Sequence, residues 1–163
     1  MTPTMIISAD LKSMLDEAIH SELYASNLYK HIANQLQRLG YLGAMKFFLK
    51  ESEAELEHYQ RHAQFQNDVG TVAKVPLIEA MSESIKSFSD AIELGYETEL
   101  ELYNSYKDFY SQASEDPVVQ QFLLQFIELQ RTSVGEYGDL LSRIQLVDGD
   151  KAGMLLIDQE LGG

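Results

Sequence analysis

Four polar side chains occupy positions that helical periodicity assigns to apolar faces, and their types are those that bind hard metal ions. Each of four long amphipathic stretches carries one near its middle: Glu22, Glu55, Glu99 and Gln130. An unpaired buried carboxylate is costly, so several that converge imply a cation that neutralises them. The pattern therefore predicts a metal site inside a helical bundle.

The second stretch adds an imidazole to this set. Glu55 and His58 form a Glu-x-x-His pair, in which positions i and i+3 share one helix face. Such a pair is a weak signal alone and a strong one beside buried carboxylates on neighbouring helices. Oxygen ligands with one imidazole and no thiolate favour iron or manganese, and a carboxylate such as Glu55 can bridge two ions.

The position of the third-helix carboxylate depends on the helix phase. Glu97 and Glu99 are two residues apart, about 200° around a helix, so only one of them can face inward. Glu99 continues the apolar stripe, whereas Glu97 lies with Asp90 on the polar face. We therefore expect Glu99 to be the inward residue.

Four long helices and a short one must position these side chains. Ser8 or Asp10 can cap the first, and Asp116 before Pro117 is a typical helix start. Two short connections predict antiparallel hairpins, and the extended segment 70–80 is long enough to cross between them along the bundle. The sequence thus predicts an all-α four-helix bundle whose helices cover about 8–39, 44–68, 81–113, 117–148 and 152–161.

Composition narrows the range of functions. A chain of 163 residues with 45% hydrophobic content is expected to form one domain, residues 1–163. The absence of cysteine excludes disulfides, iron–sulfur clusters and thiol catalysis, and a net charge of −14 argues against nucleic acid and favours cations. Neither a signal peptide nor a membrane span is predicted, so we expect no membrane partner and, by default, a cytoplasmic location.

Several motifs resemble those of non-haem ferritins over essentially the whole chain. They are SELYASNLY at 21–29, the Glu-x-x-His pair, FIELQ at 126–130 and the tail at 143–161. The resemblance implies a ferritin-like four-helix bundle with one long crossover and a short C-terminal fifth helix. It also implies a set of site residues, with Tyr29 beside the metal and the ligands Glu22, Glu55, His58, Glu99 and Gln130.

The function that the resemblance implies is iron storage with ferroxidase activity. One iron would bind Glu22, Glu55 and His58, and a second would bind Glu55 and Glu99 with Gln130 close by. Fe(II) would be oxidised by dioxygen or peroxide and stored as Fe(III) mineral in a shell, of 24 subunits by family resemblance, with the fifth helix at a four-fold contact. Tyr29 would hydrogen-bond near the centre or supply an electron.

Departures from the family pattern refine these expectations. Ala54 and Ser133 stand where bacterial ferritins often carry further acids, which favours two iron positions over three. Gln121 and Leu124 replace acids that line many three-fold channels, so iron is expected to reach the centre by another path. No haem is expected, because Leu56 follows the bridging glutamate where a haem-ligating methionine would stand.

Other residues and functions have plainer interpretations. We expect His62 to be structural, with a supporting role near the metal, and Tyr103, Tyr106 and Tyr110 to be packing residues with hydrated hydroxyls. Two alternative functions remain. One is a shell subunit without catalysis that only nucleates mineral, and the other is a small di-iron or di-manganese oxidase that stores nothing.

Overall fold

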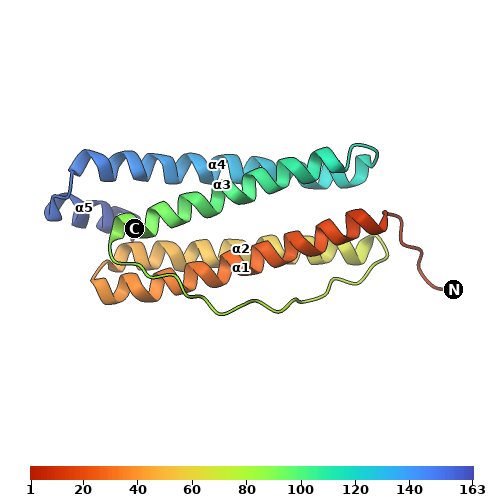
Figure 1. Cartoon of the computed structure of the whole chain (residues 1–163), viewed down its shortest axis with the longest axis horizontal. Coiled ribbons are helices and arrows are strands. Elements are labelled where there is room, and N and C mark those ends of the chain that lie inside the picture. Colours follow the sequence, from red (N-terminus) through yellow and green to blue (C-terminus); the bar gives the residue numbers. More distant parts are fainter.

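The computed structural model describes residues 1–163 as an all-helical chain of two antiparallel hairpins. Figure 1 shows α1 beside α2 and α3 beside α4, with the α2–α3 connection running the length of the bundle past α1. The predicted four-helix bundle with one long crossover and a short fifth helix is therefore confirmed. The helices are α1 (Ala9–Leu39), α2 (Leu42–Asp68), α3 (Phe88–Gln112), α4 (Pro117–Val147) and α5 (Lys151–Leu161).

Side chains at the helix starts set the bundle's boundaries. The side chain of Ser8 accepts a hydrogen bond from the amide of Leu11 and begins α1. Asp116 does the same for the first turn of α4, which has Pro117 in its first position. Both caps satisfy amides that the helix itself leaves free. Gly40, in the left-handed region at φ 93°, ends α1 and lets the chain reverse into α2.

The start of α3 differs from the sequence expectation. A helix from residue 81 was expected, because Met81 and Ile85 continue the apolar period, but α3 begins at Phe88. Ser87 caps the helix by accepting from the amide of Asp90. The residues before it are extended, and the amide of Ile85 donates to the side chain of Gln35 on α1. Ile85 is buried by this crossover rather than by a helical turn.

The fifth helix contacts the start of the second helix through a hydrogen bond. Tyr41 provides no side-chain cap for α2. Asp158 of α5 supplies one instead, because its Oδ1 accepts from the amide of Ala44 at 2.7 Å. A carboxylate at this end of a helix also interacts favourably with the helix dipole.

No helix in the chain is long and apolar enough to cross a membrane.

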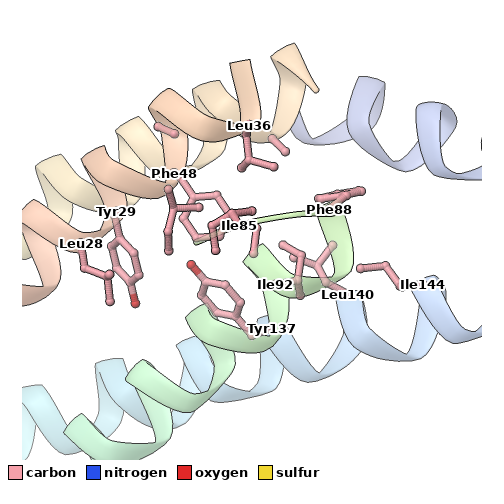
Figure 2. Close-up of a cluster of buried hydrophobic side chains, with 14 of the residues drawn as sticks. Leu28, Tyr29, Leu36, Phe48, Ile85, Phe88, Ile92, Tyr137, Leu140 and Ile144 are labelled. Carbon is pink, nitrogen blue, oxygen red and sulfur yellow. The ribbon is translucent and has the colours of Figure 1, made fainter. Parts of the chain in front are cut away.

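The apolar core consists of two separate clusters. The larger one includes Tyr29, Phe48, Phe88 and Tyr137 and is shown in Figure 2. The smaller one, toward the other end of the bundle, includes Phe126 and nine further residues. The buried glutamates of α1, α2 and α3 and the buried Gln130 of α4 belong to neither cluster.

Candidate metal centre

All the ligands expected from the sequence are buried side chains of the four-helix bundle. Glu22 comes from α1, Glu55 and His58 from α2, Glu99 from α3 and Gln130 from α4. Glu22, Glu99 and Gln130 have no exposed surface, and Glu55 and His58 are 3% and 8% exposed. Glu97, the alternative to Glu99, is exposed on α3. The helix phase therefore places Glu99 inward, as the apolar stripe predicted.

Three of these residues form a compact set of ligand atoms. Glu22, Glu55 and His58 each offer one atom, and these atoms lie within 4.8 Å of one another. Nδ1 of His58 is 3.0 Å from Oε2 of Glu55 and 3.4 Å from Oε2 of Glu22. Oε2 of Glu22 has no hydrogen-bond partner although it is buried. Two carboxylates and one imidazole are a suitable ligand set for iron or manganese.

Charge within this group is unevenly distributed between the two glutamates. Burial alone would raise the pKa of Glu22, but its interactions with Glu55 and His58 outweigh burial and lower this pKa to about 2. Burial and the neighbouring charge of Glu22 raise the pKa of Glu55 well above its usual range. Glu22 is thus the more acidic of the two, and a cation bound between them would favour loss of the proton from Glu55.

Glu99 is not part of that compact group, and both of its carboxylate oxygens are already engaged in hydrogen bonds. Oε1 accepts a hydrogen bond from the hydroxyl of Tyr29. Oε2 accepts from Nε2 of Gln130 at 2.6 Å. The same Nε2 also contacts the backbone carbonyl of Glu99 at 3.3 Å, and Oε1 of Gln130 has no partner. A metal that binds Glu99 must therefore displace or share one of these two hydrogen bonds.

Tyr106 was expected to be a packing residue with a hydrated hydroxyl, and this expectation is wrong. Tyr106 is 3% exposed, and its hydroxyl donates a hydrogen bond to Oε1 of Glu22. Nε2 of His62 lies 2.7 Å from the same hydroxyl. Since the phenolic proton is used toward Glu22, His62 is the donor in that second bond. Burial lowers the pKa of His62 to about 4, so its ring is neutral near pH 7.

The sequence did contain a signal for this pair. Tyr106 is seven residues after Glu99, and His62 is seven after Glu55. Seven residues return nearly to the same helix face, so each lies two turns along from an expected ligand. Aromatic packing then fixes the imidazole, whose ring stacks on Phe126 at a centroid distance of 4.2 Å. The spacing alone does not predict that α3 lies close enough to α1 for Tyr106 to contact Glu22.

The positions that depart from the family pattern carry no acid near the centre. Ala54 and Ser133 are partly buried, on α2 and α4. Gln121 and Leu124 are exposed on α4. The two-position centre expected from these residues stays a prediction, as does the path by which iron would reach it.

Comparison with known proteins identifies the family. The family of ferritin-like domains, named Ferritin, matches residues 12–147. A probable bacterial non-heme ferritin-like protein of Haemophilus influenzae is 26% identical over 159 residues, 96% of each chain. The bacterial non-heme ferritin of Bacteroides fragilis (strain 638R) is 28% identical over 160 residues, which are 96% of this chain and 99% of that protein.

Two further comparisons agree with that match. The ferritin of Pacifastacus leniusculus is 30% identical over 153 residues, which are 90% of this chain and 84% of that protein. The fold is also that of an open pore ferritin from Archaeoglobus fulgidus, with a TM-score of 0.92, 23% identity and coverage of 96% of this chain and 98% of that one. With the helical topology and the buried glutamate–histidine cluster, these matches show that the chain is a member of the ferritin family.

Proposed function

We propose that this protein oxidises Fe(II) with dioxygen or peroxide at a two-iron centre within the subunit and stores the product as Fe(III) mineral. The observation that carries the proposal is the buried cluster of Glu22, Glu55 and His58, whose ligand atoms lie within 4.8 Å of one another, in a chain of the ferritin family. Buried acids at this density are costly without a cation, so their retention favours metal binding.

The two iron ions would occupy unlike positions. The first would bind Glu22, Glu55 and His58, whose ligand atoms are close together. Oε2 of Glu22 has no hydrogen-bond partner, so it is free to bind the ion. The second would share Glu55 as a bridge and bind Glu99, with Gln130 close by. Because the oxygens of Glu99 are engaged by Tyr29 and Gln130, we expect the first position to fill before the second.

The chain's own residues would then prepare the reaction. Loss of the proton from Glu55 lets its carboxylate bridge the two ions, and the negative charge of the ligands stabilises the ferric product relative to Fe(II). The bond from Tyr106 holds one oxygen of Glu22 and leaves the other free for iron. Tyr29 holds Glu99 and, as the family resemblance implies, can supply an electron.

Storage requires assembly into a hollow shell, for which 24 subunits are proposed by family resemblance. The fifth helix offers a contact surface, because Leu155 and Leu156 are 55% and 57% exposed on α5. Apolar residues that are exposed next to each other on a docked helix favour burial against another subunit. The net charge of −14 would attract Fe(II) to the assembly.

The activity can be tested by the absorbance time course after aerobic addition of Fe(II). The parent protein should show a fast phase that Glu22→Ala loses, because the first position loses a carboxylate. Glu97→Ala is the matched control, since it removes an exposed acid from the same bundle and should leave the fast phase unchanged.

Particle size, measured on the same samples, separates the alternatives. A large hollow particle without a fast phase in the parent would favour a shell subunit that lacks catalysis. A dimer with a fast phase would favour a small di-iron or di-manganese oxidase that stores nothing. Background autoxidation alone, equal in all three proteins, would contradict the ferroxidase proposal.

A further inference from the structure

Three buried tyrosines surround the candidate centre, and they differ in what their hydroxyls contact. Tyr29 on α1 donates to Glu99, and Tyr106 on α3 donates to Glu22. The hydroxyl of Tyr137 on α4 is buried without a hydrogen-bond partner. Figure 2 shows the hydroxyl of Tyr137 directed toward the α1–α2 pair and that of Tyr29 directed toward the α3–α4 pair. Only Tyr29 and Tyr106 therefore donate a hydrogen bond to an expected iron ligand.

Tyr106 occupies the mirror position of Tyr29 across the centre. Tyr29 contacts the carboxylate of the second iron position, and Tyr106 contacts that of the first. The bond from His62 into the Tyr106 oxygen keeps the phenolic proton pointed at Glu22. The ring is held by the nearly parallel ring of Phe126, at a centroid distance of 5.1 Å. Each iron position thus has its own buried phenol, connected through one carboxylate.

The number of electrons needed to reduce dioxygen to water gives the two phenols a chemical role. Reduction of dioxygen to two water molecules needs four electrons and four protons, whereas two Fe(II) ions supply two electrons. Two electrons alone stop the reaction at hydrogen peroxide. A phenol can supply one electron when its proton has somewhere to go, and a hydrogen-bonded carboxylate provides that acceptor.

We propose that Tyr106, together with Tyr29, supplies the third and fourth electrons, so that this protein reduces dioxygen to water without releasing hydrogen peroxide. The inference rests on the proposed ferroxidase function and assigns dioxygen as the oxidant. In one turnover, dioxygen, two Fe(II), two phenols and two solvent protons give two waters, two Fe(III) and two neutral tyrosyl radicals. The O–O bond and both phenolic O–H bonds break, and the phenolic protons leave along the bonds to Glu22 and Glu99.

Tyr137 is an internal control for this assignment. It is fully buried like Tyr29, and its ring packs on Gly95, where a Cβ atom would collide with it. It lies near the centre, where burial and the charges of Glu51 and Glu99 raise its pKa well above the usual range and Tyr29 partly opposes the shift. Its hydroxyl nevertheless makes no hydrogen bond to an expected iron ligand. Loss of this hydroxyl should therefore leave the electron count unchanged.

The test is a single turnover of the assembled protein, with two Fe(II) per subunit mixed with oxygenated buffer. Hydrogen peroxide is assayed as the iron is consumed, and tyrosyl radicals are counted by electron paramagnetic resonance after rapid freezing. The parent should release no peroxide and form two radicals per centre. Tyr106→Phe should release one peroxide per dioxygen and lose the radical that depends on Tyr106. Tyr137→Phe should match the parent.

Three results would overturn the inference. They are one peroxide per dioxygen from the parent, a parent that forms at most one radical per centre, and a centre that reacts only with added peroxide. The radical count in the parent can still contradict the inference when Tyr106→Phe fails to fold or to bind iron. A parent that oxidises no iron above background would instead contradict the ferroxidase proposal itself, so the two failures are distinguishable.

Discussion

The two halves of the candidate centre are built from similar residues but are held in different states. In one half, Glu22 and Glu55 face His58 and present ligand atoms that lie within 4.8 Å of one another. In the other half, Tyr29 and Gln130 occupy both oxygens of Glu99. The first half resembles a site prepared for a cation, and the second is closed by its own hydrogen bonds. Burial alone does not make a carboxylate a ready ligand; what its oxygens already contact matters as much.

The difference also concerns charge. His58 lies within 3.4 Å of both Glu22 and Glu55, whereas no basic side chain contacts Glu99. Glu99 is instead satisfied by two neutral donors. Burial raises the pKa of Glu99, although these two donors partly oppose the shift. Neutral donors hold a carboxylate in place without supplying a counter-charge, so a second cation would be the first positive charge in contact with Glu99.

The largest expected effect comes from removing Glu55, the residue that is proposed to bind both ions. Glu55→Ala should abolish the fast phase of iron oxidation, because both positions would lose the proposed bridging ligand. Anaerobic titration with Fe(II) should show that both tight positions disappear. Glu53→Ala removes an exposed acid from the same helix and should retain both. If one tight position survives in Glu55→Ala, the two halves do not share a ligand.

A smaller effect is expected from removing the hydrogen bond by which Gln130 occupies one oxygen of Glu99. Gln130→Glu removes the amide donor to Oε2 of Glu99 and adds an anionic oxygen ligand, so affinity for the second cation should rise by about tenfold or more. The first position should change little. In the metal-free protein the two buried carboxylates would face each other without a donor, which should cost about 1–3 kcal/mol of unfolding free energy.

Two measurements check this second prediction. Anaerobic metal titration resolves the two positions, and denaturant unfolding with and without metal gives the stability. An unchanged second affinity would mean that Gln130 does not close this half. A weaker first affinity would mean that the two positions are not independent.

The sequence predicted the inward faces of the helices better than the contacts between them. Apolar periodicity placed Glu22 and Glu99 inside because one misplaced carboxylate per stripe is visible in the residue order. It did not reveal that Tyr29 and Gln130 close on Glu99, or that Tyr106 reaches Glu22, because such contacts depend on how neighbouring helices are rotated and spaced. The start of α3 was missed for a related reason. Ile85 is apolar because the extended crossover buries it, and the helical period alone cannot distinguish this from a helix.

The smallest expected effect concerns Glu51, a partly buried residue one helical turn before Glu55. Burial and the charge of Glu99 raise the pKa of Glu51 from 4.5 to about 7. A carboxyl group whose pKa is raised by folding stabilises the fold fully below pH 4.5, and this contribution is lost as the pH rises through 7. Glu51→Gln should therefore match the parent at pH 4. At pH 8 it should be more stable by about 1–3 kcal/mol.

Denaturant unfolding of the metal-free proteins across this pH range checks that prediction, with Glu53→Gln as the exposed control. A parent and a Glu51→Gln variant that differ equally at pH 4 and pH 8 would show that titration of Glu51 is not involved. The result also bears on the two halves, because the charge of Glu99 is one cause of the shift. A cation bound at Glu99 should bring the pKa of Glu51 back toward 4.5 and reduce the benefit of the substitution, whereas a cation held by Glu22 and His58 alone should change it less.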